Sequence, residues 1–262
     1  MVDTPSRARV IAMANQKGGV GKTTATVNIG AAIAEMGHRV LIIDLDPQGN
    51  ASSSLGLTPA SLQVSVYDVL LHDVALENCI EATAVRHLFV APSNLNLAGA
   101  EIELVPVMGR ETRLRRAIDA VADQYAYVLI DCPPSLGLLT INALTAADEV
   151  LVPMQCEYIA VEGMVQLDQN VALVRANLNP RLKISMVLLQ MYDVRTKLSQ
   201  DVVDEVRKHK EWGPKTLKTL IPRTVRIAEA PSYGKPVITF DPSSVGAKAY
   251  REAAKEVVAW PV

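Results

Sequence analysis

The sequence predicts an α/β protein with a doubly wound, mostly parallel sheet flanked by helices. Short apolar runs recur along the chain, and segments with helical periodicity separate them. Runs that are apolar on both faces are typical of parallel strands covered by helices. A glycine-rich loop also lies between the first expected strand and the first expected helix. Strand and helix then alternate to the end of the chain, which favours one doubly wound sheet over two separate domains.

The individual elements follow from these patterns. Strands are expected at Val10–Ala14, Arg39–Asp44, Tyr127–Asp131, Glu149–Pro153 and Ile184–Gln190. Helices are expected at Thr24–Met36, Leu114–Gln124, Leu138–Ala147, Val161–Asn177, Leu198–Lys210 and Val245–Trp260. The stretch Ala51–Ser65 is the most loop-like and is expected at the surface near the ligand. Since no long linker is visible, we expect a single domain over residues 1–262, with a flexible N-terminal arm at residues 1–8.

Composition and charge exclude several classes of protein. With 49% hydrophobic residues the chain can build a large core, and with 4% aromatics it is poorly suited to reading bases by stacking. The formal net charge of −2 means that nucleic-acid binding would need a local basic patch. The three cysteines lie far apart, which argues against an iron–sulfur or zinc site. The N-terminal residues lack an apolar signal segment, so we expect a soluble, cytoplasmic protein.

The strongest signal is the stretch Gln16–Thr24 (QKGGVGKTT), which lies between a strand and a helix. Glycines let the backbone turn tightly, so that successive N–H groups point at phosphate oxygens at the start of the helix. In such a phosphate-binding loop Lys22 neutralises the β- and γ-phosphates and the Thr23 hydroxyl ligates Mg²⁺. The standard pattern has glycine at its first position, whereas this chain has Gln16 there and an additional lysine, Lys17.

Three aspartates follow expected strands at the edge where open α/β sheets bind ligands. Asp131 ends an apolar strand, so it is expected to hold Mg²⁺ through a coordinated water opposite Thr23. Asp44 and Asp46 lie at and just beyond the end of another strand. Aspartates are also common as helix caps and in turns, and this structural alternative is weakest for Asp131 and Asp46.

The loop resembles the deviant Walker A motif of the ParA/MinD superfamily of P-loop ATPases. Further motifs match in order along nearly the whole chain, most closely those of chromosomal ParA proteins, also called Soj. They are NQKGGVGKTT (residues 15–24), DLDPQGN (44–50), DCPPS (131–135), EY (157–158), MYDVRT (191–196) and IPRTVRIAEAP (221–231). The resemblance implies a P-loop NTPase fold and slow, Mg²⁺-dependent ATP hydrolysis.

The resemblance also implies roles for particular residues. Lys17 would be the signature lysine, which reaches across an ATP-bound homodimer to the phosphates of the other subunit, much as an arginine finger does. Asp46 would position the attacking water, and Asp44 would lie near the Mg²⁺ shell. The ATP-binding set that this family pattern implies is Lys17, Gly18, Gly19, Val20, Gly21, Lys22, Thr23, Thr24, Met191, Pro222, Arg223 and Thr224.

A patch of arginines is the candidate DNA interface. The candidates are Arg195, Arg223 and Arg226, and the resemblance matches Arg195 and Arg226 to positions that contact DNA in ParA relatives. The family pattern implies non-specific double-stranded DNA and a ParB-type protein as partners, with nucleoid association in the cytoplasm. The alternative is a MinD-like ATPase that binds membrane. That class needs a basic amphipathic C-terminal helix, whereas the final segment here mixes acids with bases, so no membrane partner is expected.

Overall fold

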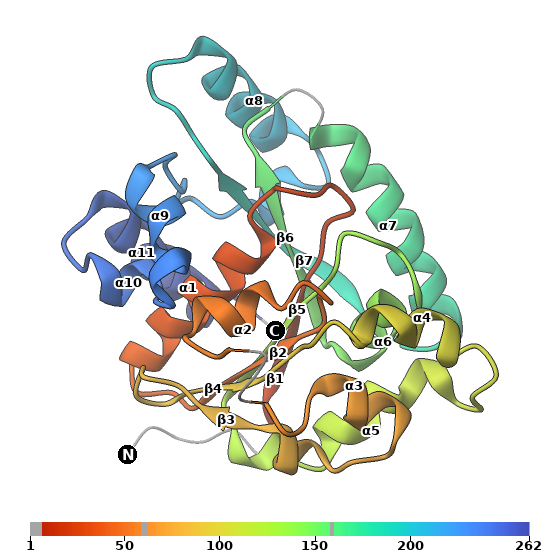
Figure 1. Cartoon of the computed structure of the whole chain (residues 1–262). Coiled ribbons are helices and arrows are strands. Elements are labelled where there is room, and N and C mark those ends of the chain that lie inside the picture. Colours follow the sequence, from red (N-terminus) through yellow and green to blue (C-terminus); the bar gives the residue numbers. More distant parts are fainter. Residues whose placement is uncertain (1–6, 59–61, 158–159, 262) are drawn as a thin grey trace.

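A seven-stranded sheet forms the centre of the molecule (Figure 1). The structure is a computed structural model, and it describes residues 7–58, 62–157 and 160–261. The strand order is β3-β4-β2-β5-β1-β6-β7, and only the β3–β4 pair is antiparallel. The strands are β1 (Arg9–Met13), β2 (Val40–Asp44), β3 (Glu81–Ala82), β4 (Leu88–Ala91), β5 (Tyr127–Asp131), β6 (Glu149–Gln155) and β7 (Lys183–Gln190). This arrangement confirms the predicted doubly wound, mostly parallel α/β fold.

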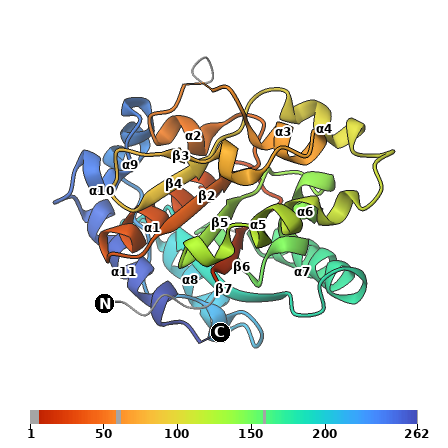
Figure 2. The same cartoon turned by 90° about the horizontal axis from the view of Figure 1, so that it is seen from below.

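Helices cover both faces of the sheet (Figure 2). One face packs against α1, α10 and α11, and the other packs against α3 to α8. The α-helices are α1 (Lys22–Glu35), α2 (Asn50–Ser54), α3 (Val66–Leu71), α4 (Leu97–Glu103), α5 (Arg113–Asp119), α6 (Leu138–Ala146), α7 (Ala160–Asn177), α8 (Lys197–Lys208), α9 (Val225–Glu229), α10 (Val237–Phe240) and α11 (Val245–Ala259).

The central strands are apolar throughout because helices exclude water from both faces. In β1, Val10 and Ala12 belong to the core on one side of the sheet, while Ile11 and Met13 belong to the core on the other. All four side chains are fully buried. This alternation follows from the two-residue period of a strand.

The structure adds elements that the sequence patterns do not predict. Strands β3 and β4 span only two and four residues, and α3 and α4 span six and seven, too few to display a clear period. Helix α2 begins at Asn50, so the stretch predicted as a loop from Ala51 is helical in its first part. The helix predicted over Leu114–Gln124 ends at Asp119, and a 3₁₀ turn follows it.

The two ends of the described chain meet at the amino-terminal edge of the sheet. Residues 1–6 of the predicted arm lie outside the described residues, but Ala8 is buried and its N–H donates to Ala122 O at 2.9 Å. The fold therefore includes Ala8, one residue before β1. The Arg9 side chain pairs with Glu149 of β6 and donates to Val257 O of α11 at 2.8 Å.

Candidate nucleotide site

The loop between β1 and α1 has a backbone that requires glycine. Gly19 and Gly21 have φ of 74° and 84°, in the left-handed region that side chains disfavour. A Cβ on Gly21 would lie 2.9 Å from Gln190 Nε2, so a side chain would also collide there. Gly21 is the residue directly before α1, and the positive end of that helix therefore adjoins the loop. Such a cradle of backbone N–H groups suits phosphate.

Side chains from neighbouring strand ends hold this loop from outside. Gln155 Nε2 donates to Gly19 O at 2.8 Å, and Gln190 Nε2 donates to Val20 O at 2.9 Å. Asn15 Oδ1 accepts the N–H of Lys17 at 3.0 Å. Asn15, Gln155 and Gln190 are not among the predicted site residues. A signal was present, since each of the three polar residues follows or ends an apolar strand run.

The two lysines of the loop have different surroundings. Lys22 is 7% exposed, and its Nζ donates to Lys17 O at 3.3 Å. Burial lowers the pKa of Lys22, although the charges of Asp131 and Asp46 oppose that shift. The Lys17 side chain is partly exposed, and its Nζ lies 3.5 Å from Glu157 Oε2. The buried lysine therefore lies inside the loop, while Lys17 is accessible at its rim.

The buried Asp131 carboxylate lies close to Lys22, and a second buried carboxylate, Asp44, lies beside Asp131. Thr23 Oγ1 donates to Asp131 Oδ2 at 2.7 Å. Asp131 and Asp44 are neighbours in the register of β5 and β2, and both are fully buried. Burial is the main cause that raises the pKa of each, and for Asp131 the Asp44 charge raises it further. A divalent cation would compensate two adjacent buried charges, and hydroxyl and carboxylate oxygens are the donors that Mg²⁺ prefers.

The protein alone would supply only part of a metal shell. Within the described ranges, no group of three or more His, Cys, Asp or Glu side chains is placed to hold a metal ion. Asp44 is already engaged, because its Oδ2 accepts Ser52 N–H at 2.8 Å and Ser52 Oγ–H at 2.7 Å. A bound Mg²⁺ would therefore depend on Thr23, Asp131, water and the ligand's phosphate oxygens. The place of Asp44 near that shell stays a prediction.

Asp46 lies at the mouth of the site. It is partly exposed, and its Oδ1 accepts the N–H of Gln48 at 3.0 Å, which stabilises the turn before α2. It is also near enough to Lys22 for its charge to act on that lysine. The carboxylate thus has a turn-forming contact and is close to Lys22, and its role in positioning water stays a prediction.

A hollow of about 560 Å³ adjoins the loop. Its walls include all four residues expected around the base, namely Met191, Pro222, Arg223 and Thr224, together with Gly21 and Thr24. The Thr224 hydroxyl accepts the N–H of Ile227 and so caps α9. The structure therefore brings the loop and the expected base site together around one cavity, and base binding itself stays a prediction.

Comparisons with known proteins decide the family. A family model described as an AAA domain matches residues 8–184. Soj of Bacillus subtilis is 55% identical over 96% of this chain and 98% of its own, and ParA of Caulobacter vibrioides is 49% identical over 95% and 94%. The chain belongs to the ParA/Soj family.

Two solved structures are similar to this ParA-family chain. MinD of Pyrococcus horikoshii complexed with Mg-ADP is 28% identical, with coverage of 95% and 96% and a TM-score of 0.77. Cobyrinic acid a,c-diamide synthase of Mycobacterium smegmatis with bound ADP and magnesium is 43% identical, with coverage of 96% and 94% and a TM-score of 0.84.

The three arginines of the predicted DNA patch are exposed, but two of them have acidic partners in this ParA-family chain. The Arg195 guanidinium donates two hydrogen bonds to Asp193, at 2.9 and 2.7 Å, and its backbone N–H donates a third at 3.0 Å; together they lower the Asp193 pKa to about 2. Arg226 lies 3.1 Å from Glu229 and 3.4 Å from Asp241. Arg195 and Arg223 also line the hollow beside the loop. Two of the three arginines therefore border the hollow, and the patch is less positive than the count of arginines suggests.

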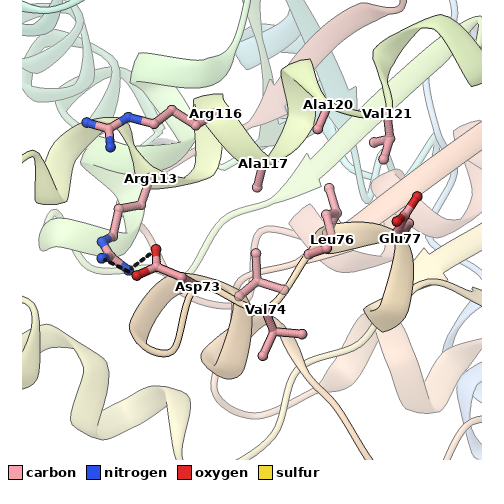
Figure 3. A pocket seen from close by; sticks show the side chains of 11 residues that line it. Asp73, Val74, Leu76, Glu77, Arg113, Arg116, Ala117, Ala120 and Val121 are labelled. Atoms are coloured by element: carbon pink, nitrogen blue, oxygen red, sulfur yellow. Dashed lines mark hydrogen bonds and ion pairs between the residues drawn. The ribbon is translucent and has the colours of Figure 1, made fainter.

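A second hollow lies on the other face of the sheet (Figure 3). It measures about 370 Å³, and α5 and the segment after α3 form its walls. An ion pair between Arg113 and Asp73, at 3.0 Å, borders an otherwise largely apolar lining. None of the predicted site residues contributes to this hollow, so it is separate from the nucleotide site.

Proposed function

We propose that this chain is an ATP-dependent DNA-partitioning ATPase. ATP and Mg²⁺ drive formation of a nucleotide-sandwich homodimer, the dimer binds DNA without sequence preference, and hydrolysis stimulated by a ParB-type partner releases it. The observation that carries this proposal is the contact of Thr23 with buried Asp131 beside buried Lys22, under a glycine loop that opens on a base-sized cavity. The identity to Soj and ParA relatives supports the same function.

Different residues of the site bind the phosphates and the metal ion. N–H groups of the loop and Lys22 bind the β- and γ-phosphates, whose negative charge offsets the desolvation of the buried Lys22 ammonium. Thr23 and Asp131 would hold Mg²⁺, and the ion would supply positive charge that offsets the charge of the phosphates. Asp46 orients the attacking water from the mouth of the site.

Two features support dimerisation through the carboxyl edge of the sheet. The contact between Lys17 and Glu157 is a partly exposed ion pair at 3.5 Å, which contributes about 0–1 kcal/mol, so a phosphate can replace it. The surface around α4 also exposes large apolar side chains, with Leu95, Ile102 and Met108 exposed by 73%, 77% and 93%. A second copy would cover such a surface. Lys17 then reaches the partner's nucleotide.

Dimerisation would also strengthen DNA binding. One arginine patch with internal acidic partners binds phosphates weakly, whereas two patches on one dimer act together at high effective concentration. ATP can therefore switch DNA binding on without changing the patch itself. A protein of this kind works in the cytoplasm and on the nucleoid.

The C-terminal helix favours DNA over a membrane surface. The apolar face of α11 is buried in the core beside α1, including Ala247, Tyr250 and Val257. That face is therefore not free to enter a lipid surface, as the MinD-like alternative requires. Of the helices in the described ranges, none has the length and apolar character that a membrane crossing demands.

Paired co-sedimentation assays test the proposal. The protein is mixed with double-stranded DNA or with anionic liposomes, each with ATP, with ADP and without nucleotide. We expect ATP-dependent recovery with DNA, lost at high salt, and equal recovery with liposomes in all three conditions. Lys22→Met is the matched control and should remain in the supernatant. ATP-dependent recovery with liposomes would favour the alternative, and no nucleotide dependence in either assay would contradict both functions. Hydrolysis measured with and without a ParB-type protein then tests the partner.

A further inference from the structure

The outer side of the phosphate loop has its own set of hydrogen bonds. A loop that points N–H groups at phosphate must direct the carbonyls of the same peptide units away from it. The carbonyls of Gly19, Val20 and Gly21 all accept from glutamine amides. Buried carbonyls without partners would be costly, so these donors favour this orientation of the loop.

The two glutamines that supply these donors are directly paired across the sheet. Gln155 ends β6, Gln190 ends β7, and the register places them opposite one another. Gln155 is partly exposed, whereas Gln190 is 2% exposed and bonds to two carbonyls, at 2.9 Å from Val20 O and 3.2 Å from Gly21 O. Gln190 is therefore the buried member of the pair, and its amide donates to two carbonyls of the loop.

A third side chain fixes the direction of the Gln190 amide. Tyr250 of α11 is 1% exposed, and its hydroxyl donates to Gln190 Oε1 at 2.8 Å. Reversing the amide would place its oxygen against two carbonyls and its NH₂ group against the tyrosine hydroxyl. The hydrogen-bond network thus permits one orientation. The C-terminal helix is connected in this way to the loop at the start of α1.

We propose that Gln190 is a positioning residue for nucleotide binding, and that Tyr250 acts through it. The proposal rests on the proposed function only in taking a nucleotide as the ligand. Gln190 holds the Val20 carbonyl outward, so this part of the N–H cradle is formed before the phosphates arrive. The Gly21 carbonyl also accepts the Ala25 N–H of α1 at 2.9 Å, so it keeps a partner without Gln190. Without the amide donor, the free loop can rotate the Val20 peptide unit, and ordering it on binding reduces affinity.

Two substitutions test this role. Gln190→Met keeps the length of the side chain and removes the donor, and Tyr250→Phe keeps the ring and removes the hydroxyl. With a fluorescent ATP analogue and with ADP, we expect Gln190→Met to weaken binding about tenfold, the worth of one or two hydrogen bonds. Tyr250→Phe should weaken it less. The double variant should bind no worse than Gln190→Met alone, because the Tyr250 hydroxyl donates to Gln190 and acts through it.

A hydroxyl elsewhere provides the matched control. The Tyr67 hydroxyl donates to Glu103 at 2.7 Å on the other face of the sheet, so Tyr67→Phe should bind nucleotide as the unchanged protein does. If Gln190 has a purely structural role, Gln190→Met will lower the ligand-free melting temperature and leave the nucleotide affinity unchanged. That result would overturn the proposal. If Gln190→Met does not fold, Tyr250→Phe decides, since unchanged affinity there is equally contrary. Failure of the unchanged protein to bind ATP or ADP would instead refute the proposed function, and this inference with it.

Discussion

Replacing Lys22 with methionine should affect the stability of the protein and its affinity for ATP differently. Lys22 is 7% exposed, and its Nζ donates to one backbone carbonyl at 3.3 Å. Burial lowers its pKa, so the charged form is held there at a cost when no anion is bound. Methionine occupies a similar volume without charge. The ligand-free protein should therefore melt at an unchanged or slightly higher temperature.

The same change should nearly abolish ATP binding. A lysine that contacts two phosphates makes two charge-assisted bonds, each worth about 1.5–3 kcal/mol. Losing both costs at least about 3 kcal/mol, a fall in affinity of about 150-fold or more. Titration with a fluorescent nucleotide measures the affinity, and the rise in melting temperature with ATP and Mg²⁺ measures it independently.

An exposed lysine supplies the comparison. Lys183 begins β7 on the surface, and Lys183→Met should leave both measurements unchanged. Full ATP affinity in Lys22→Met would refute the assignment of the loop to phosphate binding. A fall of several degrees in the ligand-free melting temperature would instead show that the buried ammonium supports the fold, contrary to the cost inferred from its burial.

Three further outcomes are expected. Asp46→Asn keeps an acceptor for the Gln48 N–H but loses the carboxylate, so the rate of ATP hydrolysis should fall about 100-fold. An ATP-bound dimer should then accumulate on size-exclusion chromatography, whereas a monomer in the presence of ATP would indicate a structural role for Asp46. Arg195→Glu should weaken DNA binding in a shift assay with little change in melting temperature, because its pair with Asp193 is exposed, and full DNA affinity would contradict the patch. Thiol reagents at pH 8 should label none of the three cysteines until the protein is denatured. All three are buried, and burial raises the pKa of Cys79 and Cys156 to about 12. Rapid labelling of the native protein would contradict that burial.

The parts of the fold that sequence predicts are those with a repeated local signal. The five long parallel strands are continuous apolar runs, and the structure has all of them within two residues of the predicted ends. β3 pairs with β4 through two exposed residues, and nothing in Glu81–Ala82 marks such a pairing. Its existence depends on contacts between distant segments, which a local pattern does not contain.

The site, too, has a part that the sequence predicts and a part that only the fold brings together. The loop glycines and Lys22 are adjacent in sequence, so their spacing alone predicts the cradle. Gln190 and Tyr250 are separated from that loop by more than 160 residues, and only the folded sheet and α11 bring them to it. Arg226 illustrates a further limit, because its partner Asp241 lies beyond α10 and reaches it only in the folded chain.

The contacts of Arg9 determine where a reporter can be attached. Its bond to Val257 O brings the start of β1 and the end of α11 together at the amino edge of the sheet. The phosphate loop follows the opposite end of β1, a strand of five residues that spans about 17 Å. A fluorophore or tether joined near Arg7 or Pro261 is thus separated from the nucleotide mouth by the depth of the sheet. Imaging and surface-immobilisation experiments can therefore use either end while leaving the carboxyl edge free for a partner to approach.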